Sequence, residues 1–429
     1  MPEPVVMRLL GVRAGELRVV AALIAVSLAL GFGLLAIDLA IDASLLVHGA
    51  TAELPWTLIG NGVAVLLAGV ALVGLRQRLP PTLFPWAPVA CLGGLALLVV
   101  PVLVDAGAGF TTFALLSASQ RVLLALALVG FWTLTARCLD IEQSRRLYGL
   151  VGAGETLAAL LAALATAPLL RALGLAPLLA VAFALLLLAT VGMRALARAY
   201  PGDRTTEVAT AAGPATAAQR RLVAACCAYH TGYNVAYFVV ELAMFAALQR
   251  VHGGRADAIA GSLGAVLLVR LAITTAIRVF LTGRILTRLG LAVGLAAAPG
   301  LVAVGAAVVG LAGLAGLTAA VALLTAESAA RQALGQPAFL AAQRALPGPR
   351  RERTLVLVET IVEPLSTGLA GGLLLALPAA WLVEDVLLGL ALPAGLAWLL
   401  AAVAVARAHR AVLAESGPDS DPTPSPIAR

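Results

Sequence analysis

Apolar runs of about twenty residues follow one another along this sequence, separated by short stretches that carry charges or proline. A helix of about that length spans the hydrocarbon core of a bilayer. The pattern contains twelve such runs, so it predicts a chain that crosses a membrane twelve times. We place the crossings near residues 19–41, 55–75, 83–104, 110–135, 148–170, 175–197, 222–248, 259–281, 291–311, 313–334, 354–377 and 386–406.

A polar segment of small residues separates the sixth run from the seventh, and the two halves resemble each other. Each has an arginine cluster after its fourth run, followed by a run with glutamate and small residues: SRRLYGLVGAGETLAALLA and PRRERTLVLVETIVEPLSTGLAGG. Two six-helix halves in parallel orientation are typical of the major facilitator architecture. We predict an all-α membrane protein of this type, with an N-terminal half 1–199, a linker 200–221, a C-terminal half 222–408 and a disordered tail 409–429.

The composition indicates a chain surrounded mostly by lipid. Hydrophobic residues make up 61% and charged residues 12% of the 429 residues, and the mean hydropathy is +1.01. These values exclude a soluble protein of two or three domains, whose surfaces need more charge. The sequence contains no zinc-protease motif, phosphate-binding glycine loop or nucleophile elbow. We therefore expect no enzyme, no cofactor and no resident metal, with the lipid bilayer as the main partner.

Arginine carries the topology signal, because the chain has no lysine. The connections on one side of the predicted spans hold almost all the arginines outside the span centres, and among these we count Arg278. The opposite side holds only Arg171, Arg250 and Arg255. Because basic residues near span ends concentrate on the cytoplasmic side, we expect both termini and the linker to be cytoplasmic, in a bacterial inner membrane. The net charge of +7 is then a topology signal rather than a nucleic-acid footprint.

Ionisable residues inside the spans are the functional candidates, because each is costly unless it meets water, a partner or a ligand. They fall in the predicted first, fourth, fifth, seventh, eighth, tenth and eleventh spans, and the centres of spans 3, 6, 9 and 12 lack them. This division suits a fold in which the third helix of each three-helix unit lies at the periphery and the other helices line a central polar cavity. Predicted substrate-binding residues are Gln120, Arg121, Tyr233, Asn234, Tyr237, Arg270 and Arg331, and predicted ion- or proton-coupling residues are Asp38, Asp42, Glu155, Glu241, Glu327, Glu359 and Glu363.

Helical spacing groups several of these residues, since positions three, four or seven apart share a helix face. One stripe in the seventh span, which we expect to face the cavity, is formed by His230, Tyr233 or Asn234, Tyr237 and Glu241. A lone histidine is also often structural. Glu359 and Glu363 share a face, and two neighbouring carboxylates in a low dielectric suit proton binding.

The buried arginines permit two interpretations. Arg121 lies near the middle of its span, where a guanidinium group either binds an anionic substrate or forms an ion pair with Asp42 or Glu155. Glu327 and Arg331 are four residues apart, so they either neutralise each other or contribute charges to the site. The sequence leaves both alternatives open.

Small residues in the fifth span predict a close contact between helices. Gly152, Gly154 and Ala158 follow one another at spacings of two and four residues. Small side chains at such positions let two helix backbones approach each other.

The segment FWTLTARCLDIEQSRRLYGLVGAGETLAALLA resembles the fourth and fifth helices of the ATP/ADP translocase-like nucleotide transporters, a branch of the major facilitator superfamily. The matching residues are Phe131, Trp132, Arg145, Arg146, Leu147, Tyr148, Leu150, Gly154 and Ala158. The segment IDASLLVHGATAELPW is similar to the end of that family's first helix, with matches at Asp42, Gly49, Ala50, Leu54 and Pro55. Ile41 departs from the pattern, because the family has a basic residue there.

The resemblance and the buried charges together predict a secondary transporter that works by alternating access. If the arginines bind the substrate, it is an anionic or nucleotide-like metabolite. If the carboxylates dominate, the protein expels a cation or drug in exchange for protons. A third interpretation is a transporter-derived membrane protein that acts as a sensor or scaffold without transporting.

Overall fold

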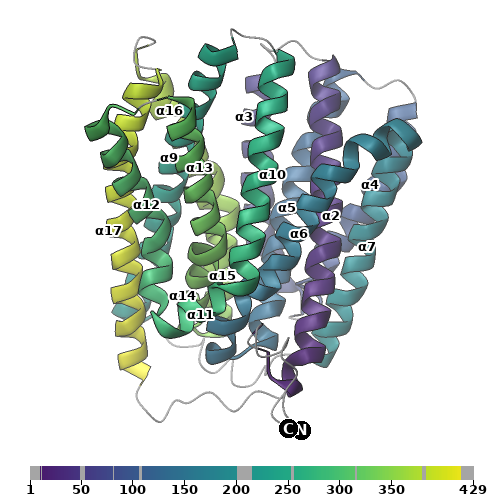
Figure 1. The fold of residues 1–429 in the computed structure, drawn as a ribbon. Coiled ribbons are helices and arrows are strands. Elements are labelled where there is room, and N and C mark those ends of the chain that lie inside the picture. Colours follow the sequence, from purple (N-terminus) through teal and green to yellow (C-terminus); the bar gives the residue numbers. More distant parts are fainter. Residues whose placement is uncertain are drawn as a thin grey trace.

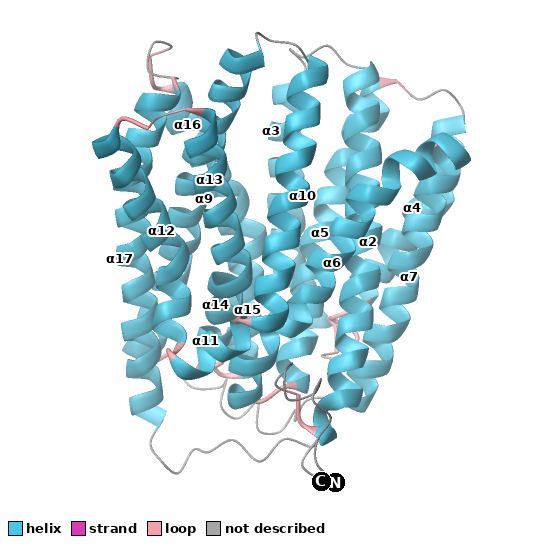
Figure 2. Ribbon diagram, viewed as in Figure 1, coloured by secondary structure: helices cyan, strands magenta, loops and turns pink. Residues whose placement is uncertain are grey.

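The computed structural model consists of helices joined by short turns and loops (Figures 1 and 2). It describes residues 10, 12–48, 54–80, 82–105, 109–200, 215–252, 256–314, 316–378 and 383–416, and within these ranges it contains no strand. Most of the predicted linker and the last part of the predicted tail lie outside the described residues.

The helices fall into two sets of six crossings. The first set begins after the short 3₁₀ turn η1 (Ala14–Glu16) and comprises α2 (Leu17–His48), α3 (Leu54–Arg78), α4 (Ala87–Asp105), α5 (Phe110–Cys138), α6 (Ile141–Leu173) and α7 (Leu175–Ala199). The second set comprises α9 (Ala217–His252), α10 (Ala256–Phe280) with α11 (Thr282–Arg288), α12 (Leu291–Ala312), α13 (Leu317–Ala330) with η3 (Arg331–Gly335) and α14 (Gln336–Gln343), α15 (Gly348–Leu357) with η4 (Val358–Val362) and α16 (Glu363–Leu375), and α17 (Glu384–Ser416).

Length and hydropathy account for these crossings. Nine spans in the described ranges are long and apolar enough to cross a membrane, and the pair α10 and α11 passes the same test despite a bend of 51° between them. The two remaining crossings are α3, whose apolar part Gly60–Leu72 is shorter, and the continuous helix of α13, η3 and α14. The prediction of twelve crossings in two six-helix halves is therefore confirmed.

The helices extend beyond the predicted spans wherever a polar turn continues the helix. The fifth crossing, α6, was expected from residue 148 and begins at Ile141. Asp140 caps it, because its carboxylate accepts a hydrogen bond from the Gln143 backbone N–H at 2.7 Å and the Gln143 side chain accepts one from the Asp140 N–H. Such a capping box satisfies free N–H groups at a helix start. Hydropathy alone does not detect it.

Helices without central charges lie at the outside of the bundle, as expected. α4 packs mainly against α7, and α12 packs against α17. Their outer faces present large apolar side chains, including Leu95 and Leu98 of α4 and Val304 of α12, each more than half exposed. Large exposed apolar surface of this kind is suited to lipid.

The small residues of α6 form a close contact with α2, which confirms their predicted role. A Cβ placed on Gly154 would lie 2.9 Å from the Ile24 carbonyl oxygen and 3.0 Å from the Ser27 Cβ. A Cβ on Gly31 would lie 3.0 Å from the Ala158 Cβ. The two backbones therefore approach each other at a distance that only small residues permit.

The two halves meet near one end of the bundle, which we call the arginine-rich end: α2, α6, α9 and α15 begin there and α17 ends there (Figure 1). Arg137 in α5 forms a buried ion pair with Glu352 in α15. α6 also packs against α10 and α11 so closely that a Cβ on Gly283 would lie 2.5 Å from the Arg146 carbonyl oxygen. The halves are therefore held together at this end.

Candidate functional site

A cavity of about 310 Å³ lies between the two halves. The first half contributes residues of α3 and α5, and the second contributes residues of α9, η3, α14, η4 and α16. Five predicted site residues line it together: Arg121, Tyr233, Arg331, Glu359 and Glu363. His230 of the predicted polar stripe also lines this central cavity, whose wall is completed by Val65, Leu124, Ala125, Leu128, Tyr229, Gln336, Phe339 and Leu340.

Arg121 reaches the cavity as one partner of an ion pair. Its guanidinium nitrogen lies 3.0 Å from a carboxylate oxygen of Asp38 in α2. The two side chains are 36% and 21% exposed; Arg121 lines the central cavity, and Asp38 lines a neighbouring pocket of the first half. The sequence offered Asp42 or Glu155 as the partner. The structure shows Asp38, one helical turn before Asp42, in this role, and the side chain of Asp42 lies outside the described residues.

Arg331 is also paired within its own half. Its Nε donates to a carboxylate oxygen of Glu327 at 2.8 Å, and Glu327 is fully buried and accepts a second hydrogen bond from Ser328. The guanidinium carbon of Arg331 lies 4.3 Å from the ring centre of Tyr233 and 5.3 Å from that of Tyr237. Cation–π contacts and the ion pair therefore fix the side chain at the cavity wall. Both alternatives from the sequence apply, since Glu327 neutralises Arg331 and Arg331 still lines the cavity.

Glu363 is the centre of a hydrogen-bonded cluster. Its carboxylate bonds to the His230 Nε2 and accepts a hydrogen bond from the Asn234 amide at 2.8 Å. The same Asn234 amide nitrogen donates to the Ser366 hydroxyl at 2.6 Å. Asn234 is buried behind the cavity, so it orients Glu363 instead of facing a ligand. The predicted stripe of α9 therefore serves the site through His230 and Tyr233.

Glu359 differs from the other carboxylates of the cavity. Within the part of the chain that the structure describes, it has no hydrogen bond and no ion pair, and its charged neighbours are His230, Glu363 and Glu155. A membrane-embedded carboxylate without a partner gains most from binding a proton or a cation. Glu359 is therefore the candidate carboxylate of the cavity for binding either one.

Two turns of π-helix shape the cavity wall. Arg331–Gly335 and Val358–Val362 are π-helical, and these segments carry Arg331 and Glu359. A π-helical turn contains one more residue per hydrogen-bonded loop than an α-helical turn, and it frequently occurs at functional sites. The apolar periodicity does not predict these turns, although both crossings combine buried charges with glycine or proline.

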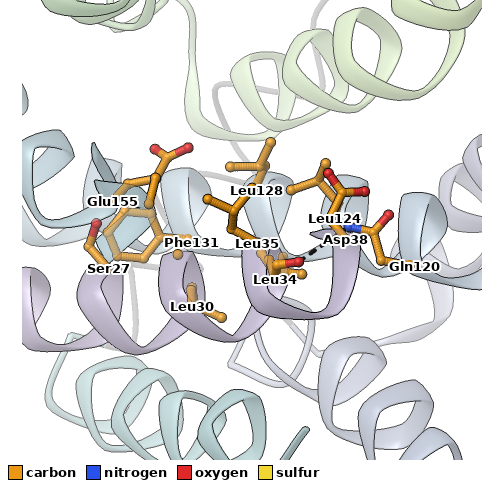
Figure 3. A pocket seen from close by; sticks show the side chains of 13 residues that line it. Ser27, Leu30, Leu34, Leu35, Asp38, Gln120, Leu124, Leu128, Phe131 and Glu155 are labelled. Carbon is orange, nitrogen blue, oxygen red and sulfur yellow. Dashed lines mark hydrogen bonds between the residues drawn. The ribbon is translucent and has the colours of Figure 1, made fainter. Parts of the chain in front are cut away.

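A second pocket, of about 150 Å³, lies within the first half among α2, α5 and α6 (Figure 3). Asp38 and Glu155 lie at its two ends, with Leu35 and Leu128 between them. Gln120 closes one end, and its amide nitrogen contacts the Leu34 carbonyl oxygen at 3.5 Å. Gln120 was predicted as a substrate-binding residue and Glu155 as an ion- or proton-coupling residue, and both line this neighbouring pocket rather than the central cavity.

Arg278 is the functional residue that the sequence analysis misplaced. It was counted with the arginines outside the membrane, and the structure shows it buried between the halves. Its guanidinium group donates to the Gly152 carbonyl of α6, to the Gln332 carbonyl at 3.0 Å and to the Gln336 side chain at 2.6 Å. Glu155 lies 3.9 Å away. Position 278 lies inside the predicted span 259–281, so the sequence already indicated that this arginine lies within the membrane.

The remaining predicted residues lie beside the central cavity, not on its wall. Tyr237 donates to a Glu241 carboxylate oxygen at 2.6 Å, which satisfies both groups within α9. Arg270 in α10 lies within electrostatic range of Glu241, and its buried Nε has no hydrogen-bond partner in the described residues. These three residues form a polar group between α9 and α10, which adjoins Arg331 through the Tyr237 ring.

Comparison with solved structures identifies the architecture. A bacterial homologue of the iron transporter ferroportin, in an outward-facing state with soaked iron, superposes with a TM-score of 0.69 at 14% identity, covering 91% of this chain and 99% of that one. The chain has the major facilitator fold. The E. coli fucose:proton symporter FucP gives a TM-score of 0.64 at 13% identity, over 91% and 99% of the two chains. The proton:xylose symporter XylE bound to 6-bromo-6-deoxy-D-glucose gives 0.62 at 13% identity, over 91% and 95%.

These neighbours are transporters of the major facilitator superfamily. At such low identity the likeness concerns the fold alone. No family model matches the sequence, and no curated protein matches it. The particular resemblance to nucleotide transporters therefore rests on the short segments quoted above.

Proposed function

We propose that this protein is a secondary active transporter that works by alternating access and couples substrate movement to protons. The observation that carries the proposal is the central cavity, which lies between two six-helix halves and contains ionisable side chains at membrane depth. Buried charges in such a place mark substrate and ion pathways. Contact between the halves at the arginine-rich end supports a state in which the cavity is closed toward that end.

The pairing of charges supports proton coupling. Arg121 and Arg331 each have an acid in their own half, Asp38 and Glu327 respectively, whereas Glu359 has no partner among the described residues. A carboxylate that alternates between a protonated and an ionised form can carry a proton across as the cavity changes its access. We assign this role to Glu359, with the Glu363–His230 pair beside it.

The same features favour a small cationic or neutral polar substrate. The cavity of about 310 Å³ is near the lower bound of ordinary small-molecule sites, which hold about 300–1,000 Å³. Its two arginines are compensated, so no permanent positive charge is left over for an anion. Tyr229, Tyr233 and Phe339 supply aromatic faces, which bind cations and apolar rings.

An anionic, nucleotide-like substrate is the second candidate. The observation that favours it is the position of Arg331, which lines the cavity and donates to Glu327 through its Nε, so that its two terminal nitrogen atoms can serve a ligand. Such an anion would have to compete with Glu327 for this arginine. A cationic or neutral ligand does not face that competition, so we rank it first.

The test begins with ligand identification. Purified full-length protein is screened by thermal unfolding at pH 6 and pH 8 against organic cations, sugars, carboxylates and nucleotides, because a specific ligand raises the unfolding temperature by mass action. We expect a cationic or neutral polar compound to give the largest shift. A larger shift with a nucleotide at both pH values would reverse the ranking of the two candidates, and no shift in any class together with no uptake would favour the scaffold interpretation.

Proton coupling is tested with Glu359→Gln in proteoliposomes that carry an imposed pH gradient. The amide cannot release a proton, so we expect uphill accumulation of the identified ligand to be lost while exchange of labelled for unlabelled ligand continues. Glu415→Gln, at the exposed end of α17, is the matched control and should leave both activities unchanged. Normal proton-driven accumulation by Glu359→Gln would overturn the assignment.

We also propose that the arginine-rich end is cytoplasmic and that the membrane is a bacterial inner membrane. The asymmetry of arginine near the helix ends supports this orientation. In it, residues 200–221 connect the halves 1–199 and 222–408 on the cytoplasmic side, and the tail 409–429 lies on the same side. The closed end of the described state then faces the cytoplasm.

A further inference from the structure

At the arginine-rich end, a pocket of about 250 Å³ lies between α6 of the first half and α10 and α11 of the second. It is separate from the central cavity. We propose that this pocket binds the phosphate group of an anionic membrane lipid. The argument uses the charges of the pocket, the apolar surface beside it and its depth in the membrane.

The charged side chains that line the pocket are all positive. Arg146, Arg278, Arg284 and Arg288 line the pocket, and no carboxylate does so among the described lining residues. Arg146 is paired with Glu16, and Arg278 is held by carbonyl and amide oxygens and has Glu155 at 3.9 Å, which fixes these two cations in place. Arg284 and Arg288 of α11 add two further cations to the lining. Arginine forks suit phosphate oxygens, and basic pockets between membrane helices bind acidic lipid headgroups. Thr287 adds a hydroxyl group to the lining.

An apolar face of α10 leads from the pocket into the membrane. Val269, Ile273 and Phe280 are 53%, 41% and 51% exposed, and their spacing of four and seven residues places them on one side of the helix. Phe280 also lines the pocket, so headgroup site and apolar face are continuous. A molecule with a phosphate at one end and acyl chains at the other fits both.

The depth of the pocket agrees with a lipid headgroup. α10 has 25 residues, and at about 1.5 Å per residue this length crosses the hydrocarbon core. Phe280 ends that helix, and α11 turns away by 51°. Arg284, Thr287 and Arg288 on α11 are exposed at this level, where lipid phosphates lie. Free phosphate would use only the charges and would leave the apolar face without a role.

The bound lipid would join the two halves. One side of the pocket is Arg146 and Leu150 of α6, and the other is α10 and α11. A phosphate held by arginines from both sides stabilises the contact between the halves at this end. Since that contact must open during alternating access, an anionic lipid would favour the described state and slow its opening.

The experiment measures thermal unfolding of the purified full-length protein in detergent. Dioleoyl-phosphatidylglycerol is compared with dioleoyl-phosphatidylcholine, which has the same acyl chains and no net charge, and with inorganic phosphate. Of these three compounds, we expect only the anionic lipid to raise the unfolding temperature. In Arg284→Gln/Arg288→Gln, the lipid concentration for half-maximal shift should rise by about tenfold or more, because each lost surface arginine weakens the attraction to anionic lipid severalfold.

Arg407→Gln/Arg410→Gln removes two exposed arginines of α17 at the same end, outside the pocket, and is the matched control. It should respond to the lipid as the unaltered protein does. Equal shifts with both lipids, an unchanged response of the α11 variant, or an equal loss in the control would each overturn the proposal. A full shift with inorganic phosphate alone would show a soluble-phosphate site and reject the lipid as its occupant.

Discussion

At the scale of single residues, the membrane-embedded charges of this protein are mostly compensated in pairs. Arg121 has Asp38, Arg331 has Glu327, and Glu363 has His230. Pairing lowers the cost of keeping each charge away from bulk water. Glu359 differs from these residues, because it faces the same cavity without a partner among the described residues. The compensated residues build the cavity, and the uncompensated one is available for ligand or proton.

Replacing Arg121 tests whether its pair is structural. Arg121→Gln leaves Asp38 without its cation, so the free energy of unfolding should fall, by less than the ~3–5 kcal/mol typical of breaking a fully buried pair, because both side chains are partly exposed. Adding Asp38→Asn should recover part of the loss. Thermal unfolding of the single and double variants measures both effects.

Glu155→Gln combined with Arg121→Gln provides the control, because Glu155 lies beside Arg278 and not beside Arg121. This combination should recover none of the lost free energy of unfolding. If it restored stability as well as Asp38→Asn does, the pairing described here would be wrong. If Arg121→Gln kept full transport as well as stability, Arg121 would have no part in the substrate site.

At the scale of helices, close contacts without large side chains hold the first half together. α6 contacts α2 through Gly154 and Ala158, and glycine at position 31 completes the contact from α2. Membrane helices gain little from the hydrophobic effect, since lipid is as apolar as leucine, so their association depends on close packing. The same helix, α6, also contacts α10 and α11 of the other half.

Gly154→Leu should therefore prevent correct folding. The first side-chain carbon would lie 2.9 Å from the Ile24 carbonyl oxygen, and neither backbone can move without disturbing the contact. We expect the yield of monodisperse protein in size-exclusion chromatography to fall severalfold. Gly94→Leu in α4 is the matched control, because a Cβ there meets nothing within 4 Å, and its yield should be unchanged. Equal yields of the two variants would contradict the close contact.

At the scale of the whole molecule, the arrangement of two halves around a cavity depends on where the chain places its charges. The arginine-rich end carries the contacts between the halves, including Arg137 with Glu352 and Arg278 with the Gly152 carbonyl oxygen. Both contacts join residues more than a hundred positions apart in the sequence. In the alternating-access cycle that we propose, rocking of the halves would break them, so they would help to set the balance between the two access states.

The orientation is tested by reporter fusions. Reporters placed after Ala212 and after Ala414 should show cytoplasmic activity, because the arginine-rich connections remain on that side. A reporter after Gly109, at the opposite end of α5, should show periplasmic activity and serves as the control. Periplasmic activity at either of the first two positions would reject the proposed topology.

The sequence alone determined the class of fold, the number of crossings and the peripheral position of the charge-free helices. These properties follow from apolar length and from the cost of charge in lipid, which act on each segment separately. The tertiary structure alone decided which charges meet. Arg121 pairs with Asp38, Arg278 is buried between the halves, and Gln120 faces a neighbouring pocket. Such pairings depend on the rotation and relative height of helices distant in sequence, and periodicity within one helix carries no information about either.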